Sequence, residues 1–366
     1  MKQRSAALGF LATLLVVASV AGTAFTQDAT DNLPAHPRYA RLTPHLRNDI
    51  APPPATPLTT WNGSFSYGGH TYKYNMVGTA PTTGVSTTVP VFLIPIALQY
   101  KTGTTTRTFS PSHVLSNGQT VTANTLASPI FKTGIDFNQG GTDLGNTQYI
   151  DAFQRGNFWS KVSKAPGYHL LLGTPKVMPV QTIVVPSVDG QIATEFGVKV
   201  GLADINWFDA QVHTLITKFT AIHPNTLPIF ITYDAYLTQA GCCIGGYHSS
   251  MGSASAAQAY AHFTYIDKPV FAQNVSALSH EVGEWADDPL VVNSGNPVAC
   301  GTLEVGDPEE GFANYGGFPY TLGGFTYTLQ DMVWLPYFGA AASTSANGWE
   351  TFQGNPFSLG ICNNGG

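Results

Sequence analysis

The chain has 366 residues and a formal net charge of −6, and charged residues make up only 10% of it. Ordinary globular domains carry roughly 25% charged residues. A chain with so few charges and no basic patch is a poor partner for nucleic acid or for an anionic membrane surface, so we expect neither. The composition is typical of an exported, β-rich protein that stays soluble through hydroxyl and amide groups.

The N-terminal residues have the pattern of a secretory signal peptide. A short, positively charged start precedes an almost entirely apolar run over residues 6–20, and small residues at 22–24 permit cleavage after Ala24. The apolar run is short for a membrane span, and an uncleaved N-terminal anchor is the less favoured alternative. We therefore predict a signal peptide over residues 1–24 and a secreted protein that is not in the membrane after cleavage.

The rest of the chain divides into a linker and one domain. Residues 25–60 contain a run of three prolines and scattered polar residues, which predicts a linker or a short propeptide. No linker-like stretch interrupts residues 61–366, so we expect a single domain there. Strand and helix signals alternate along it, which predicts an α+β fold with a mixed β-sheet, a few helices, and a periphery rich in strands and loops.

Residue patterns locate the individual elements. Apolar and β-branched runs predict strands, and apolar residues at helical spacing predict helices. The predicted strands are residues 88–100, 168–172, 181–185, 227–233 and 260–266, and the predicted helices are residues 146–162, 204–222 and 276–286. The Gly-, Ser- and Cys-rich stretch 239–257 is expected to be a loop, and segments 320–327 and 330–337 are expected to be β.

The four cysteines predict two disulfides in an exported chain. Cys242 and Cys243 are adjacent, and adjacent residues rarely meet the geometry of a disulfide with each other. We therefore expect each of them to pair separately with Cys300 or Cys362. A four-cysteine zinc site is the alternative, although the spacing lacks the usual Cys-x-x-Cys pairs.

Acidic residues concentrate in one stretch. Five of the seven glutamates lie between Glu281 and Glu310. In the segment HEVGE at residues 280–284, a helix places His280 and Glu284 four residues apart on one face, where both can bind one cation. Glu281 lies beside them and can act as general base on a metal-bound water, as the glutamate does in HExxH enzymes.

A catalytic zinc site needs a third protein ligand and an open position. Glu304 is the preferred third ligand and Asp307 the second candidate; on a strand they would face opposite sides, so one of them is expected to bind. His248 is a candidate for stabilising an oxyanion or contacting substrate, or else a loop residue with a structural hydrogen bond. Two carboxylates and one histidine also suit harder ions, so Mn²⁺ and Ca²⁺ are alternatives to Zn²⁺.

The helix with its candidate ligands resembles the active-site helix of zincin-type metallopeptidases, and Glu304 follows at about the separation found in thermolysin-like enzymes. The resemblance implies a zincin-like mixed sheet in which the strand at 260–266 is an edge strand that binds extended peptide. It also offers Met332 a place beneath the metal, although a core methionine is the simpler role.

A second resemblance rests on the order of several blocks. The segments SHEVGE at 279–284, DPLV at 288–291 and LEVGD at 303–307, with CIGGYHS at 243–249 upstream, resemble the plant phosphate-induced, Exordium-like family. That family is linked to extracellular growth responses. The resemblance implies secretion and supports a metal site at the helix.

Two functional hypotheses follow. The first is a secreted zinc-dependent metallopeptidase, acting on a peptide or protein substrate with a metal-bound water and the general base Glu281. The second is a non-catalytic secreted Exordium-like protein in which the same helix holds a structural metal ion. A carbohydrate-active enzyme is disfavoured, because no carboxylate pair stands out beyond the acidic stretch.

Overall fold

The computed structural model describes residues 45–46, 56–67, 70–139, 142–157, 162–195, 197–253, 256–268, 272–293, 317–330, 332–334 and 349–351. All of them belong to one unit defined by its internal contacts, Pro34–Gly366. The predicted signal peptide and most of the predicted linker lie outside the described residues, and so do Glu304, Asp307, Cys300 and Cys362.

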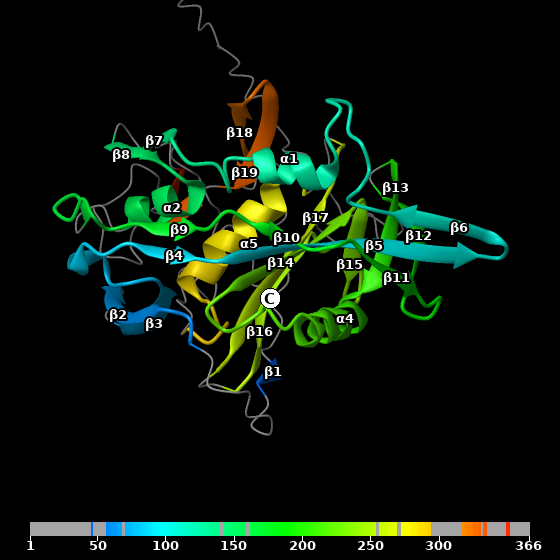
Figure 1. The fold of residues 1–366 in the computed structure, drawn as a ribbon, viewed down its shortest axis with the longest axis horizontal. Helices are drawn as coiled ribbons and strands as arrows, with labels where there is room; N and C mark the ends of the chain where they lie inside the picture. Colours follow the sequence, from blue (N-terminus) through cyan, green and yellow to red (C-terminus); the bar gives the residue numbers. More distant parts are fainter. Residues whose placement is uncertain are drawn as a thin grey trace, which may run out of the picture. The chain divides into compact units, whose positions relative to one another are not determined.

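An eight-stranded mixed sheet carries the fold (Figure 1). Its main path has the strand order β1-β16-β17-β14-β5-β10, and β6 and β11 also pair with β5. The strands are β1 (His45–Leu46), β16 (Gly246–Gly252), β17 (Gln258–Tyr265), β14 (Leu227–Tyr233), β5 (Val91–Thr102), β10 (Lys176–Val177), β6 (Thr105–Phe109) and β11 (Gln181–Val185).

Smaller sheets surround it. One has three strands in the order β12-β13-β15, and the others are two-stranded. The remaining strands are β2 (Thr60–Tyr67), β3 (His70–Val77), β4 (Thr87–Val89), β7 (Ile135–Gln139), β8 (Thr142–Thr147), β9 (Leu170–Leu172), β12 (Gly190–Glu195), β13 (Val198–Asp204), β15 (Ala235–Thr238), β18 (Gly317–Leu322), β19 (Phe325–Gln330), β20 (Met332–Trp334) and β21 (Trp349–Thr351).

The helices among the described residues are few, which confirms the predicted mixed α+β class. The four α-helices are α1 (Val121–Ala127), α2 (Tyr149–Asn157), α4 (Ile205–Lys218) and α5 (Ser276–Asp287), and Pro81–Thr83 forms a 3-10 turn. Asp204 caps α4 by accepting hydrogen bonds from the backbone N–H groups of Asn206 and Trp207 at 2.9 Å each. No helix in the described part of the chain is long and apolar enough to cross a membrane.

The strands at the centre of the sheet are fully buried, and β14 is parallel to both of its neighbours. β14 pairs in parallel with β5 on one side and with β17 on the other, and every residue of β14 and β17 is buried. Strands covered on both faces lose the alternation of polar and apolar residues and become continuous apolar runs. That is why the predicted strands at 227–233 and 260–266 were recognisable, and the structure confirms them.

Two structural expectations for this sheet are wrong. The stretch 239–257, expected to be a loop, contains strand β16, which pairs antiparallel with β17 from Gly246 to Met251. Because β16 and β14 flank it, β17 is an inner strand and not the edge strand that the zincin resemblance implied. β17 has no open edge onto which a peptide could add as a further strand.

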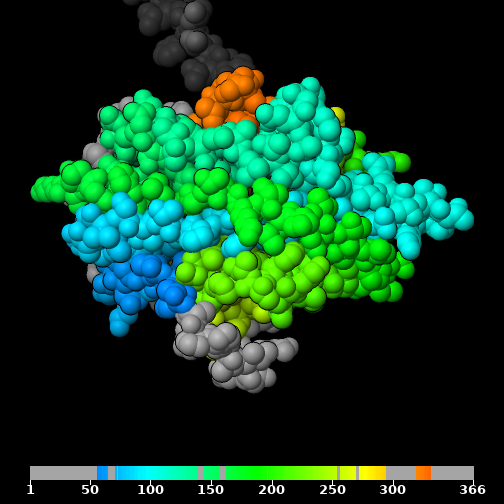
Figure 2. Space-filling model, in the orientation of Figure 1, coloured from blue at the N-terminus to red at the C-terminus, as the bar shows by residue number. Residues whose placement is uncertain are grey.

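Helices pack on both faces of the sheet. Ala259 and Phe263 of β17 belong to the same apolar core as Leu278, Val282 and Trp285 of α5. The alternate residue Tyr260 belongs to a second core with Phe208 and Val212 of α4. We call these the α5 face and the α4 face. In Figure 2 the β18–β19 hairpin, in orange, lies beside the segment that contains α1, and Tyr327 of β19 donates a hydrogen bond to the carbonyl of Asn124 at 3.3 Å.

Candidate metal centre on the α5 face

Helix α5 brings the predicted motif residues together. His280, Glu281 and Glu284 are all buried, while Val282 and Trp285 pack into the apolar core. His280 Nε2 lies 2.6 Å from Glu284 Oε1, the i, i+4 contact that the sequence implied.

Strand β16 contributes His248, which is 1% exposed. Its Nδ1 lies 3.1 Å from Glu284 Oε2 and 3.5 Å from Glu281 Oε2. One ligand atom from each of these three residues can be chosen so that all lie within 4.8 Å of one another, the arrangement of a group able to hold a metal ion. His248 therefore lies between the carboxylates of Glu281 and Glu284 in this cluster. The predicted third ligand, Glu304, and its alternative, Asp307, lie outside the described residues.

The other ring nitrogen of each histidine faces a carbonyl oxygen. His248 Nε2 lies 3.2 Å from the backbone oxygen of Asp288, and His280 Nδ1 contacts the side-chain oxygen Oε1 of Gln330. A carbonyl oxygen only accepts, so each of these nitrogens carries the proton. In neutral rings the opposite nitrogens, His248 Nδ1 and His280 Nε2, then present lone pairs to the two glutamates.

The carboxylates add further acceptors to the same space. Both side-chain oxygens of Glu281, and Oε1 of Glu284, are buried and receive no hydrogen bond. Although Glu284 Oε1 is close to His280 Nε2, a neutral ring with its proton on Nδ1 has no hydrogen to offer there. Buried acceptors that face one another without a donor are costly, and a cation or added protons would relieve the cost.

The electrostatics of the cluster point the same way. Burial, aided by the charge of Glu284, raises the pKa of Glu281 to about 8 against the opposing effect of the histidines. Burial acts to raise the pKa of Glu284 as well, but His280 and His248, when they are protonated, together lower that pKa to about 2. Burial also raises the pKa of Asp287, and the charges of Asp288 and Glu284 add to this effect. Without a positive partner, burial thus favours the neutral forms of Glu281 and Asp287, and a bound cation would favour their charged forms.

Gly246 explains how Glu281 reaches this position. A Cβ atom at Gly246 would lie 2.6 Å from Oε1 of Glu281, 2.9 Å from its Cγ, and 2.9 Å from the backbone oxygen of His262. Only glycine lets the Glu281 side chain lie against the backbone of β16. The Gly-rich composition that suggested a loop is thus a requirement for close packing of a strand against α5.

Strand β19 holds the other side of α5, a contact that the sequence did not reveal. Besides the contact of its side chain with His280, Gln330 donates a hydrogen bond from its backbone N–H to Ser279 Oγ at 2.7 Å. The hydroxyl of Tyr149 lies within hydrogen-bonding distance of the carbonyls of Ser279, at 3.0 Å, and Gln330, at 2.5 Å. No local pattern marks Gln330, which follows His280 by 50 residues. Met332 lies in β20, and its side chain is outside what the structure describes.

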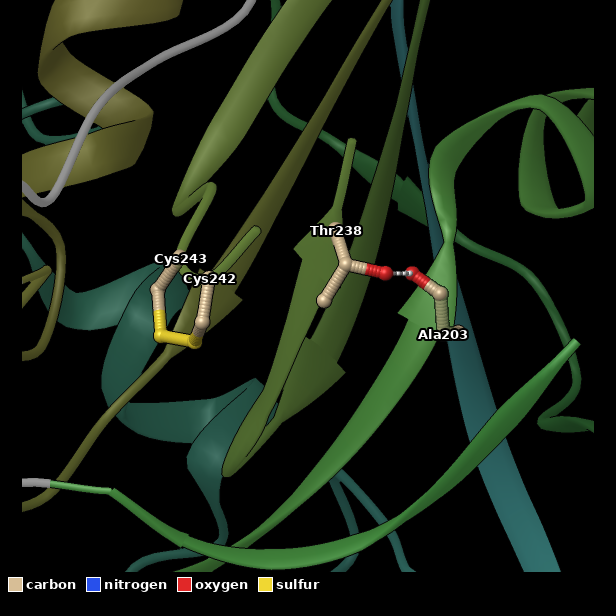
Figure 3. Close-up of a disulfide and its surroundings, with 4 residues drawn as sticks. All are labelled: Ala203, Thr238, Cys242 and Cys243. Atoms are coloured by element: carbon tan, nitrogen blue, oxygen red, sulfur yellow. Dashed lines mark hydrogen bonds between the residues drawn. A yellow bond between two sulfur atoms is a disulfide. The ribbon is translucent and has the colours of Figure 1, made fainter. Parts of the chain in front are cut away.

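The expected disulfide pairing is wrong. Cys242 and Cys243 are joined to each other, with Cα atoms 3.1 Å apart and a cis peptide bond between them. Figure 3 shows the disulfide close to β15, where the Thr238 hydroxyl donates to the carbonyl of Ala203 at 3.3 Å. Glu195 also lies near these sulfurs, but sulfurs in a disulfide are not thiolate ligands, so this second group offers no metal site in the oxidised chain.

Comparison with protein-family models found no match, and comparisons with curated proteins and with solved structures found none either. The function must therefore be inferred from the chemistry of the α5 face.

Proposed function

We propose that this chain is a secreted metallopeptidase that holds one divalent ion, preferably Zn²⁺, through His248, His280 and Glu284. The observation that carries the proposal is the buried group of His248, Glu281 and Glu284, whose ligand atoms lie within 4.8 Å of one another, with His280 Nε2 2.6 Å from Glu284 Oε1. Two histidines and one glutamate form a donor set known from catalytic zinc sites.

A ligand set of His248, His280 and Glu284 avoids a difficulty that the HEVGE motif and a second carboxylate ligand would create. His280 with two carboxylates would give a zinc ion more negative charge than catalytic sites commonly supply, which would weaken it as a Lewis acid. His248 in place of Glu304 restores two neutral ligands and one anion. The harder ions Mn²⁺ and Ca²⁺ become less suited to the site for the same reason.

Glu281 is assigned as the general base. When bound, the ion supplies a polarised water that is easier to deprotonate. Glu281 adjoins His280 on α5 and lies 3.5 Å from His248; in this assignment it is not a ligand, so its carboxylate can take up a proton and later pass it to a leaving amine. Gly246 keeps that carboxylate against β16 and thereby fixes its direction.

A structural ion in a non-catalytic secreted protein is the second candidate, and one observation favours it. The side chains of His248, His280, Glu281 and Glu284 are at most 4% exposed, which suits a permanent ion better than repeated turnover of a peptide. The predicted signal peptide and the block resemblance to the Exordium-like family are consistent with secretion under either candidate.

Two glutamine variants of α5 separate these candidates. We would measure bound metal by elemental analysis, and cleavage of a mixed peptide library, for the purified wild type and for Glu281→Gln and Glu284→Gln. Glu281→Gln is nearly isosteric and should keep the ion while losing on the order of a hundredfold or more in hydrolysis. Glu284→Gln removes an anionic ligand and should lose metal and hydrolysis together.

Each contrary result has a definite meaning. Wild type that retains no ion, and whose melting temperature is unchanged by added Zn²⁺ or Mn²⁺, would overturn the metal site. Wild type that binds the ion but cleaves no peptide would leave the structural candidate. Asp209→Asn, on the opposite face of the sheet, is the control that should leave bound metal unchanged.

A further inference from the structure

A cleft of about 450 Å³ lies between the turn of the β18–β19 hairpin and the segments on either side of α1. These two regions are the orange and teal surfaces that adjoin in Figure 2. We call it the hairpin cleft, and its chemistry comes from six of its lining residues: Asn117, Gln119, Lys132, Thr133, Phe325 and Tyr327. The volume falls within the range of roughly 300–1,000 Å³ that is usual for small-molecule sites.

The hairpin cleft has a positive charge on its wall. Among its described lining residues Lys132 is the only charged one, and it is exposed. No described lining residue is a carboxylate, although the chain as a whole has a net charge of −6. The cleft therefore favours an anionic ligand over a cation.

Two side-chain amides add hydrogen-bond donors. The side-chain oxygen of Asn117 accepts from the backbone N–H of Gln119 at 3.1 Å, and the side-chain oxygen of Gln119 accepts from the Asn124 amide at 3.3 Å. These bonds occupy one lone pair of each oxygen and orient the amides, and the NH₂ groups of Asn117 and Gln119 offer donors to a ligand. With the Lys132 ammonium they make the wall rich in donors, which suits a ligand rich in acceptors.

Aromatic and glycine residues shape the hairpin side. The rings of Phe325 and Tyr327 have centroids 4.8 Å apart and are tilted by 57°, and Phe325 is only partly buried. Gly323 and Gly324 form the turn with positive φ, and a Cβ atom at either would meet no atom within 4 Å. The turn thus leaves open space beside a ring whose face can pack against the C–H groups of another ring.

We propose that the hairpin cleft binds an acidic saccharide, with its carboxylate at Lys132, its hydroxyl oxygens at the amide donors, and a sugar ring against Phe325. A ring with many oxygen acceptors, one anionic group and apolar C–H groups matches all three features of the wall. The site is distinct from the candidate metal centre, because Tyr327 and Gln330 are three residues apart on β19, or roughly 10 Å. It does not depend on the proposed metal or on peptidase activity.

Calorimetric titration of the full mature chain tests this proposal. The probes are a short oligogalacturonate and an uncharged galacto-oligosaccharide of the same length. Lys132→Ala should weaken binding of the acidic probe at least tenfold at low salt and leave the neutral probe unaffected. Phe325→Ala should weaken binding of both probes. Lys101→Ala, which changes an exposed lysine at the end of β5, should change neither.

Gln119→Ala changes an exposed residue on the α1 side of the cleft, away from the packing of Phe325. This variant should also bind the acidic probe more weakly than the wild type. The proposal is overturned if the wild type binds neither probe, or if Lys132→Ala and Gln119→Ala bind the acidic probe as tightly as the wild type. It is also overturned if a peptide with a free C-terminal carboxylate binds more tightly than the oligogalacturonate.

Discussion

Strands β16 and β17 carry a buried polar cluster on each face. The clusters differ in their balance of hydrogen-bond donors and acceptors. On the α4 face, Asp209 Oδ1 accepts from the hydroxyls of Tyr247 at 3.0 Å and Tyr260 at 2.7 Å. His213 Nε2 lies 2.8 Å from the Tyr260 hydroxyl and 3.3 Å from Asp209 Oδ2. One carboxylate thus meets several donors, and the cluster is satisfied by protein groups alone.

On the α5 face the balance is reversed. His248 and His280 each direct one ring nitrogen to a carbonyl oxygen, and the nitrogens that remain face Glu281 and Glu284. Acceptors outnumber donors there. Burial of polar groups is common to both faces, so burial alone does not indicate function; the excess of acceptors is the basis on which we propose a cation there.

The largest expected effect belongs to the satisfied cluster. Asp209→Ala leaves the hydroxyls of Tyr247 and Tyr260 without their acceptor, and each buried unsatisfied group costs about 1–3 kcal/mol. We expect the free energy of unfolding, measured by urea denaturation, to fall by about 4 kcal/mol. The exposed variant Asp136→Ala should change it by less than about 0.5 kcal/mol.

Added Zn²⁺ should still raise the melting temperature of Asp209→Ala. If this variant loses its response to zinc while it remains folded, the two faces are not independent and the comparison fails.

The next largest expected effect is the pH dependence of stability caused by His262. This residue belongs to the α4 face and packs against Phe208 with ring centroids 4.5 Å apart. Burial lowers its pKa from 6.5 to about 3. Between these values the unfolded chain binds a proton that the folded chain does not, so this residue makes stability fall as the pH falls from 6.5 to 3. Removing it in His262→Gln should reduce the loss of stability between pH 7 and pH 4 by about 3 kcal/mol.

Urea denaturation at the two pH values measures this difference, and the exposed His223→Gln variant is the control. An unchanged difference in His262→Gln would mean that the ring becomes protonated in the folded state at mildly acidic pH. The α4 face would then also hold a buried positive charge, and the contrast between the two faces would weaken.

Local patterns in the sequence predicted those parts of the fold that depend on local spacing. The strands at 181–185 and 227–233 have the expected bounds, and α5 ends at Asp287, one residue from its predicted end. The predicted helix at 146–162 begins only at Tyr149, because Asn146 and Thr147 belong to β8. The i, i+4 relation of His280 and Glu284 on α5 is equally local.

The remaining parts depend on contacts between distant segments. Strand β16 has a composition typical of loops and becomes a strand by pairing with β17, and this pairing is what places His248 beside α5. The zincin resemblance made the predicted strand at 260–266 an edge strand, and only the sheet topology shows that it is internal. The contact of Gln330 with His280 joins a strand to a helix 50 residues earlier, a distance over which no spacing rule operates.

Gln330 gives the smallest and most specific prediction. Its side-chain oxygen fixes the proton of His280 on Nδ1 and so directs Nε2 into the cluster. Losing such an outer partner of a ligand commonly weakens metal binding about 10–100-fold. We expect Gln330→Ala to weaken Zn²⁺ binding about tenfold, or about 1.4 kcal/mol, as measured by competition with a chelating dye. Gln330→Glu, whose carboxylate also accepts from Nδ1, should restore the affinity.

Gln258→Ala is the matched control, because Gln258 is also a buried glutamine of this unit. Its side-chain amide donates to the carbonyls of Thr226 at 2.9 Å and Ala259 at 2.8 Å and does not contact a histidine. It should lower the free energy of unfolding without changing the affinity for Zn²⁺. A purely structural role for Gln330 would give the same pattern in Gln330→Ala, with lower stability and unchanged affinity. The imidazole of His280 would then not be a ligand, and the excess of acceptors on the α5 face would have to be relieved by protons on the two histidines. Zn²⁺ affinity that falls in Gln330→Ala, recovers in Gln330→Glu and stays constant in Gln258→Ala would instead show that the direction of the His280 lone pair matters for binding the ion.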